Sequence, residues 1–147
     1  NVPMQVFHQS GQNHAETTRV RYENAPTSLT VEVQPFIEDM AKAYSDADLI
    51  ICRAGALTVT EVATAGVAAV FVPLPSAVDD HQTANAKFLE KIGAAKICPQ
   101  STMTLDTLKD VLTPLMNRQL LMEMAVKARQ HAQPDATQRV VGLIQDL

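Results

Sequence analysis

Two polar side chains near the middle of the chain have types and a spacing suited to hydrogen-bond chemistry. Thr58 and Glu61 fit the S/T-x-x-E pattern, which predicts a capping box in which each side chain satisfies a free backbone N–H at a helix start. In a second interpretation Glu61, one turn into the helix, accepts hydrogen bonds from both hydroxyls of a ribose, as acidic residues do in nucleotide-binding folds. The pattern alone favours the cap, because such short motifs often match by chance.

A second polar group, Asp79-Asp80-His81-Gln82, precedes another predicted helix. One interpretation is acid–base or metal chemistry; the other is a helix start with acids placed favourably against the helix dipole. Gln82 is the more informative residue, because its amide can donate and accept hydrogen bonds toward a polyhydroxylated ligand.

Phe36 and Ile37 follow a predicted strand, where they form either a plug in the core or an apolar slot for a flat base. His8 ends another strand, and we expect it to be satisfied within the fold and not catalytic. The chain has no Walker motif and no G-x-G-x-x-G, so neither an ATPase nor an NAD-dependent enzyme has direct support.

The stretch over residues 47–66, ADLIICRAGALTVTEVATAG, must position the first polar group. Residues 49–52 form an unbroken apolar run, which predicts a strand buried on both faces. A turn of mostly small residues at 53–56 then leads into a helical pattern that Gly66 ends. The inward side of this helix is expected to hold Val59, Val62 and Ala63. A strand, a turn and a helix start in this order favour anion or nucleotide binding, because the first helical N–H groups have no internal partner.

Short β-rich or apolar runs predict five strands, at residues 4–8, 30–33, 49–52, 68–72 and 95–98. Helical patterns separate most of them, although residues 14–25 fit either a helix or a loop, and from Thr104 onward the chain is predicted to be helical. This alternation predicts an α/β fold with a Rossmann-like, doubly wound parallel sheet. We expect one domain over residues 1–147.

The composition excludes several classes of protein. The 147 residues are 46% hydrophobic and have a net charge of -4, which argues against a nucleic-acid surface. No apolar run approaches membrane-spanning length. Cys52 and Cys98 are expected to be reduced thiols in the core, and the scattered histidines and cysteines show no ligand spacing for a metal. No cofactor is predicted.

Three longer motifs, CRAGALTVTEVATAG, VFVPL and DDHQTANA, closely resemble the MurG family of bacterial glycosyltransferases. The segments HQSG, PFIEDMAKAY, EKIGAAKI and PDAT extend the similarity over nearly the whole chain. The resemblance implies the carboxy-terminal, donor-binding lobe of an inverting transferase of the GT-B architecture. That family moves N-acetylglucosamine from UDP-N-acetylglucosamine to a lipid-linked muramoyl-pentapeptide in peptidoglycan synthesis.

The resemblance also implies roles for individual residues. The backbone of Ile37, beside Phe36, would pair with uracil, and Glu61 would bind the ribose hydroxyls. Gln82 would contact the hydroxyls of N-acetylglucosamine, and His81 replaces a second glutamine that is common in the family. The donor-binding loop, with its backbone near the diphosphate and sugar, would comprise Ala56, Leu57, Thr58, Val59, Thr60 and Glu61.

The resemblance leaves other parts of the family's machinery unmatched. The chain opens at Asn1 without Met, and we expect the family's first strand with its Gly-rich phosphate loop, and the amino-terminal lobe, to lie upstream. That lobe would bind the lipid-linked acceptor and the membrane surface, on the cytoplasmic face. We therefore expect no catalytic residue among these 147 and no transfer by this chain alone. Two alternatives remain: a small soluble subunit of a split transferase, and a non-catalytic UDP-sugar-binding module.

Overall fold

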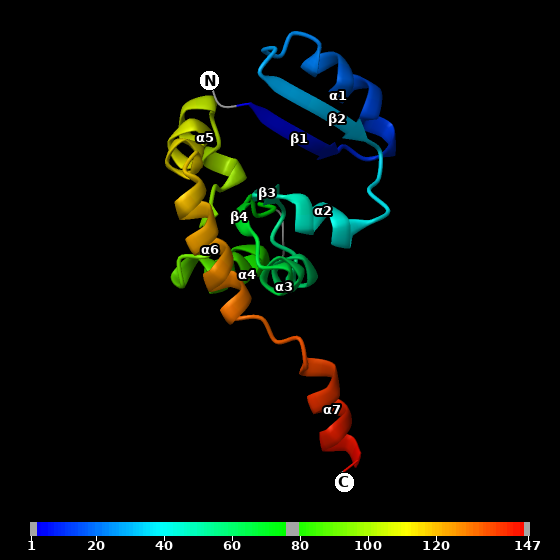
Figure 1. The fold of residues 1–147 in the computed structure, drawn as a ribbon, viewed down its shortest axis with the longest axis vertical. Coiled ribbons are helices and arrows are strands. Elements are labelled where there is room, and N and C mark those ends of the chain that lie inside the picture. Colours follow the sequence, from blue (N-terminus) through cyan, green and yellow to red (C-terminus); the bar gives the residue numbers. More distant parts are fainter. Residues whose placement is uncertain (1–2, 76–79, 146–147) are drawn as a thin grey trace. The chain divides into compact units, whose positions relative to one another are not determined.

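The computed structural model describes residues 3–75 and 80–145. The chain divides into two compact units, residues 1–43 and 44–147, and each is described by itself. Helix α2, Met40–Asp46, contains the division between them. Figure 1 shows the order of the elements along the chain. The prediction of a single domain over all 147 residues remains a prediction.

The first unit is built on two parallel strands, β1 at Met4–Gln9 and β2 at Leu29–Gln34. Their register runs from Met4 opposite Leu29 to Gln9 opposite Gln34. Between the strands, the polar stretch that fitted either helix or loop forms a short 3-10 turn followed by helix α1, Ala15–Tyr22.

His8 lies on β1, and a hydrogen bond of 3.0 Å joins its Nδ1 to the hydroxyl of Tyr22 on α1. The two rings also meet edge to face, with centroids 5.8 Å apart. This contact confirms the prediction that His8 is a histidine satisfied within the fold.

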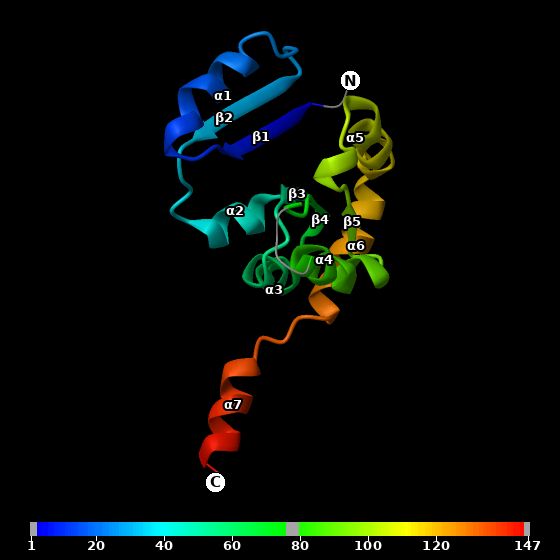
Figure 2. The same ribbon diagram turned by 180° about the vertical axis from the view of Figure 1, so that it is seen from behind.

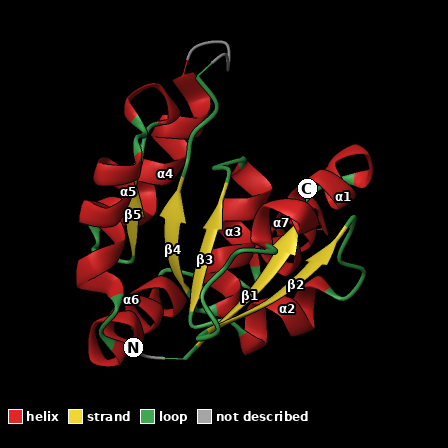
Figure 3. Ribbon diagram, turned by 90° about the horizontal axis from the view of Figure 1, so that it is seen from above, coloured by secondary structure: helices red, strands yellow, loops and turns green. Residues whose placement is uncertain are grey.

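The second unit contains a three-stranded parallel sheet in the order β3-β4-β5. The strands are Leu49–Cys52, Ala68–Phe71 and Ala95–Ile97, and their arrows point the same way in Figure 3. The central strand β4 is fully buried, as its small apolar residues predict for a strand covered on both faces. Edge strand β3 differs from the prediction, because the side chain of Ile51 is 52% exposed.

Alternate residues of β4 belong to two separate apolar clusters. In the first apolar cluster, Ala69 and Phe71 pack with residues of helices α3, Ala56–Ala65, and α4, His81–Lys91. Ala68 and Val70 pack in the other cluster. That cluster is completed by Cys98, Leu115 and Met124, with Leu108, Val111, Leu112, Leu120 and Leu121 around them. The period of two along a strand thus produces a core on each side of the sheet.

The remaining helices follow β5, and Figure 2 shows several of them from behind. They are η3 at Gln100–Thr102, α5 at Leu105–Leu112, η4 at Thr113–Leu115, α6 at Arg118–Gln130 and α7 at Ala136–Gln145. These bounds confirm the helical prediction for this region. On α4 the Phe88 side chain is 51% exposed, whereas the neighbouring Leu89 is fully buried.

Strand pairing confirms the predicted α/β class with parallel strands, in a two-stranded and a three-stranded group. Cys52 and Cys98 are free thiols; Cys98 is buried in the core as predicted, whereas Cys52 is only half-buried. Within residues 3–75 and 80–145, no cluster of side chains is suited to hold a metal ion. None of the helices in these residues has the length and apolar character needed to cross a membrane.

Candidate functional site

Helix α3 begins at Ala56, and its N-cap is Gly55, with φ -61° and ψ 149°. The first helical hydrogen bond runs from the N–H of Val59 to the carbonyl of Gly55, at 3.0 Å. Thr58 is therefore the third residue inside the helix, and no side chain caps this end. The predicted capping box of Thr58 and Glu61 is wrong, because the motif requires Thr58 as the N-cap and the observed N-cap, Gly55, lies three residues earlier.

The start of α3 leaves backbone donors available. Within the described part of the chain, the N–H groups of Ala56, Leu57 and Thr58 have no hydrogen-bond partner. Ala56 and Leu57 are exposed, and the Leu57 side chain is 80% accessible. Three free donors at the positive end of a helix dipole suit a phosphate or another anion.

The rest of the predicted loop lies on the first two turns of α3. Val59 is 6% exposed and packs in the first apolar cluster, so its side chain is part of the core. The hydroxyl of Thr60 donates to the carbonyl of Ala56 at 3.0 Å, a bond within the helix. Val62 and Ala63 are buried as predicted.

Glu61 is exposed on α3, and its carboxylate has a partner that no sequence pattern predicts. The hydroxyl of Tyr44 donates to Glu61 Oε2 at 3.0 Å. Burial of the ring raises the pKa of Tyr44 above its ordinary value, and the hydrogen bond to Glu61 and the charge of Glu61 raise it further. Burial, followed by the charge of Glu61, also raises the pKa of the Cys52 thiol to about 11. The side chain of Cys52 is therefore protonated at neutral pH.

The turn before α3 is held by side chains from two other segments. Arg53 Nη1 donates to the carbonyls of Val72 at 3.1 Å and Pro73 at 3.4 Å, just after β4. On α4, Asn85 Nδ2 donates to the carbonyl of Ala54 at 3.1 Å. No sequence motif predicts these roles for Arg53 or Asn85, although Asn85 lies one turn after Gln82 on the same helix.

Gln82 lies in the first turn of α4, and its side-chain oxygen accepts two backbone hydrogen bonds. The donors are the N–H of Leu74 at 2.9 Å and the N–H of Ala54 at 3.4 Å. These two bonds use both lone pairs of the oxygen, so of the predicted donation and acceptance toward a ligand only donation remains available. Its NH2 group has no partner among the described residues, so it is available as a donor.

The residues just before Gln82 differ in how far the structure describes them. His81 is exposed. Asp80 is the N-cap of α4 with φ 53°, and its side chain makes no capping hydrogen bond. Asp79 lies outside the described residues.

Phe36 and Ile37 belong to the first unit. The Phe36 side chain is 66% exposed, so it is not a core plug, whereas Ile37 is 9% exposed. The N–H of Ile37 donates to the side-chain oxygen of Gln9 at 2.9 Å. No described residue donates to the carbonyl of Ile37, which leaves that oxygen as the available acceptor.

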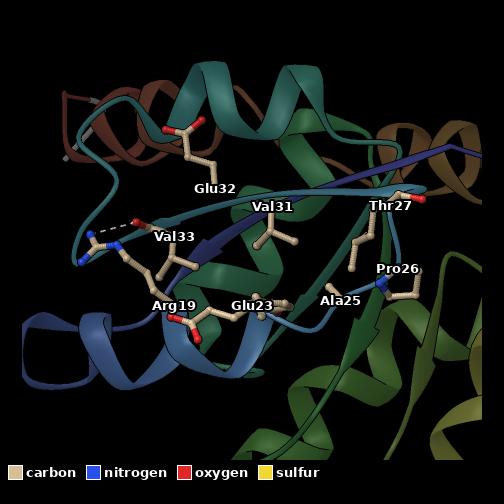
Figure 4. A pocket seen from close by; sticks show the side chains of 10 residues that line it. Arg19, Glu23, Ala25, Pro26, Thr27, Val31, Glu32 and Val33 are labelled. Carbon is tan, nitrogen blue, oxygen red and sulfur yellow. Dashed lines mark hydrogen bonds between the residues drawn. The ribbon is translucent and has the colours of Figure 1, made fainter.

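A hollow of about 510 Å³ lies elsewhere in the first unit, between α1, β2 and the segment that joins them. Figure 4 shows its lining, with Arg19 bonded to the carbonyl of Val33. The guanidinium of Arg19 also forms an ion pair of 3.2 Å with Glu16. None of the predicted site residues lines this hollow.

The parallel strands flanked by helices, with free N–H groups at a helix start that follows a strand, define an α/β protein suited to bind an anionic ligand. Residues 1–140 match the model of the glycosyltransferase family 28 C-terminal domain. The chain therefore belongs to this family.

Individual relatives agree with this assignment. The chain is 76% identical over all its 147 residues to the Acinetobacter baylyi UDP-N-acetylglucosamine--N-acetylmuramyl-(pentapeptide) pyrophosphoryl-undecaprenol N-acetylglucosamine transferase, of which it covers 40%. It is 55% identical over 135 residues, 92% of the chain, to the protein of the same name from Cupriavidus pinatubonensis, and covers 37% of it. The chain thus spans about 40% of the length of its Acinetobacter baylyi relative.

Solved structures give the same result. The crystal structure of Acinetobacter baumannii MurG matches with a TM-score of 0.97 and 74% identity, over 100% of this chain and 42% of that one. The glycosyltransferase VinC, in complex with dTDP, matches with a TM-score of 0.66 and 21% identity, over 88% of this chain and 31% of that one, and shows a shared fold. The likeness to Acinetobacter baumannii MurG confirms the resemblance to the MurG family and the expected GT-B carboxy-terminal fold.

Proposed function

We propose that this chain is the donor-binding part of a glycosyltransferase that moves N-acetylglucosamine from UDP-N-acetylglucosamine to a lipid-linked muramoyl-pentapeptide. The supporting observation is the 76% identity, along the entire chain, to a transferase named for that reaction. In the proposed reaction an acceptor hydroxyl displaces UDP at the anomeric carbon of the sugar, with inversion. The residues of this chain bind and orient the donor.

The start of α3 is proposed to bind the diphosphate. Its available donors are the N–H groups of Ala56, Leu57 and Thr58. Negative charge grows on the diphosphate as the bond to the sugar breaks, and fixed donors at a helix N-terminus stabilise such charge without reorganising. Val59 and Thr60 continue the same helix and are proposed to act only by supporting its first turn, since the N–H of Val59 is bonded to Gly55, the Val59 side chain is buried and the Thr60 hydroxyl is bonded within the helix.

Glu61 is proposed to bind the ribose. Its carboxylate is exposed and makes no capping hydrogen bond, so the competition between a cap and a ribose contact does not arise. A carboxylate has about four acceptor positions, and the hydroxyl of Tyr44 uses one of them. The others are sufficient for two ribose hydroxyls.

Gln82 is proposed to contact the hydroxyls of N-acetylglucosamine through its NH2 group. The side-chain oxygen is held by Leu74 and Ala54, which fixes the direction in which the NH2 group points. His81, exposed and adjacent, is proposed as a second sugar contact.

The uracil is proposed to be bound by the backbone of Ile37 beside Phe36. The free carbonyl of Ile37 can accept a hydrogen bond from the N3–H of uracil. The exposed ring of Phe36 offers an apolar surface for the base. The N–H of Ile37 takes part only if Gln9 releases it.

Acceptor binding and deprotonation of the attacking hydroxyl are proposed to reside in the amino-terminal lobe of the enzyme. We also propose that this lobe contacts the cytoplasmic face of the bacterial membrane. Correct positioning of two reactants can supply about 7–11 kcal/mol of barrier reduction. A chain without those functions is therefore expected to bind the donor and transfer nothing.

Two measurements test the proposal. The first is calorimetric titration of this chain with UDP-N-acetylglucosamine, UDP, ADP and GDP, in which the uridine compounds should bind more tightly. Equal affinities for all of the nucleotides would remove the assignment.

The second measurement is a transfer assay with UDP-N-acetylglucosamine and the lipid-linked acceptor. It is run with the chain alone and again with the amino-terminal lobe of the Acinetobacter baylyi relative added or fused. Turnover is expected only when both parts are present. Turnover by the chain alone would require a base among its own residues.

A further inference from the structure

We infer that Tyr44 is a positioning residue that orients the carboxylate of Glu61 for the ribose of the donor. The inference rests on the proposed function. The observation that supports it is a hydrogen bond of 3.0 Å from the hydroxyl of Tyr44, on α2, to Oε2 of Glu61, on α3.

The two ends of the Tyr44 side chain have different surroundings. The ring is half-buried and packs against the first apolar cluster, which contains Val62 and Phe71. The hydroxyl reaches the exposed Glu61 carboxylate. A ring held by the core gives its hydroxyl a fixed position, as expected for an amphipathic aromatic side chain.

Glu61 needs such a partner to be an effective ribose ligand. An exposed glutamate samples several rotamers, and binding must select one of them at an entropic cost. The bond from Tyr44 selects the rotamer before the ligand arrives. Because Tyr44 donates to Oε2, the whole of Oε1 and the second lone pair of Oε2 stay open.

The protonation of Tyr44 agrees with this role. Burial, the hydrogen bond to Glu61 and the charge of Glu61 all raise the pKa of the Tyr44 hydroxyl above its ordinary value. The group is consequently a proton donor, and Glu61 the acceptor, at every pH at which nucleotide binding is ordinarily measured.

Ligand selectivity distinguishes a positioning role of Tyr44 from a merely structural bond between α2 and α3. The test compares Kd for UDP and 2′-deoxy-UDP in the unsubstituted chain and in Tyr44→Phe. UDP should bind roughly two- to tenfold more weakly to Tyr44→Phe, the range expected for one lost hydrogen bond. 2′-deoxy-UDP should lose less, so the preference for the full ribose should shrink. A structural role would weaken both ligands equally.

Tyr22→Phe is the matched control. It removes a tyrosine hydroxyl that also has one 3.0 Å hydrogen bond, to His8 in the first unit. Its UDP affinity should equal that of the unsubstituted chain. In a Glu61→Gln background, Tyr44→Phe should have a smaller effect on UDP than it has alone, because coupled residues are not additive.

A second readout needs no substitution, because the chain contains only two tyrosines. With 3-fluorotyrosine in both positions, saturating UDP should shift the 19F NMR signal of Tyr44 and leave that of Tyr22 in place. An unshifted Tyr44 signal, or unchanged UDP affinity in Tyr44→Phe, overturns this inference while the proposed function stands. Failure of the unsubstituted chain to bind UDP overturns both.

Discussion

The side-chain oxygen of Gln82 accepts a hydrogen bond of 2.9 Å from the backbone N–H of Leu74, which ties the first turn of α4 to the segment after β4. The same oxygen also accepts from the N–H of Ala54, in the turn before α3. One side chain therefore connects the start of α4 to the segments that follow two parallel strands. Any contact of Gln82 with a ligand depends on this anchoring.

Gln82→Glu should separate the anchor from the sugar contact. A glutamate keeps an oxygen for Leu74 and Ala54 but loses the NH2 donor. We expect affinity for UDP-N-acetylglucosamine to fall more than affinity for UDP, by roughly tenfold, and the melting temperature to stay close to that of the unsubstituted chain. Paired calorimetric titrations with the two ligands measure the difference.

Gln82→Ala is the companion variant, because it removes both functions. It should lower the melting temperature as well as the sugar preference, since the backbone N–H groups of Leu74 and Ala54 lose their acceptor. If Gln82→Glu weakened both ligands to the same extent, the added charge would be the cause and the sugar contact would be refuted.

The carbonyl of Ile37 should discriminate uracil from cytosine. Uracil carries a hydrogen at N3 that can be donated to this oxygen, while N3 of cytosine is an acceptor and would face it with a lone pair. An unsatisfied polar contact costs about 1–3 kcal/mol, so CDP should bind at least about fivefold more weakly than UDP. Competition of UDP and CDP for the chain tests this, and equal affinity would contradict it.

Much of the second unit could be predicted from local pattern. Residues 49–52 and 68–71 form strands because apolar, β-rich runs lie between turn residues, and α3 ends at Gly66 in the left-handed conformation. The exposure of Ile51 was not predictable, because an apolar run does not tell an edge strand from a central one.

The sequence and the family resemblance identify which residues are candidates for the site, but not which groups those residues contact. The S/T-x-x-E pattern at Thr58 is typical of a helix start, yet the helix begins at Ala56. The bond between Tyr44 and Glu61 joins residues 17 apart in sequence. A hydrogen bond of that kind is a tertiary contact, and no local sequence pattern predicts it.

Thr58 and Thr104 provide a direct comparison of a false and a true helix cap. Thr104 Oγ1 accepts from the N–H of Thr107 at 3.2 Å, and Thr107 Oγ1 accepts from the N–H of Thr104 at 2.7 Å. Thr104→Ala should therefore lower the free energy of unfolding by about 1 kcal/mol. Thr58→Ala should change it by no more than about 0.5 kcal/mol. Urea denaturation of both variants measures this, and an equal loss would restore Thr58 as a cap.

Gly66 and Gly93 are a second matched pair, with φ 69° and 70°. Alanine in this left-handed region costs about 1–2 kcal/mol at either position. An added Cβ at Gly66 would lie 3.0 Å from Arg129 Cβ, near the helix backbone, whereas at Gly93 it would meet the flexible end of Lys127 at 3.2 Å. Gly66→Ala should therefore destabilise the chain more than Gly93→Ala. Thermal unfolding of the two variants decides the order, and a larger loss at Gly93 would refute it.

Cys52 should be an unreactive thiol because of burial and the charge of Glu61. Its pKa of about 11 lies above the ordinary value of 9.0, so the nucleophilic thiolate is scarce at neutral pH. At pH 8 we expect alkylation by iodoacetamide to be at least about tenfold slower than for free cysteine. The rate should rise between pH 9 and about 11, the window over which the folded chain loses this proton. Glu61→Gln removes the second cause of the shift, so it should speed the reaction at pH 8. Peptide mapping assigns the modified cysteine, and alkylation of Cys52 at the rate of free cysteine would contradict the raised pKa.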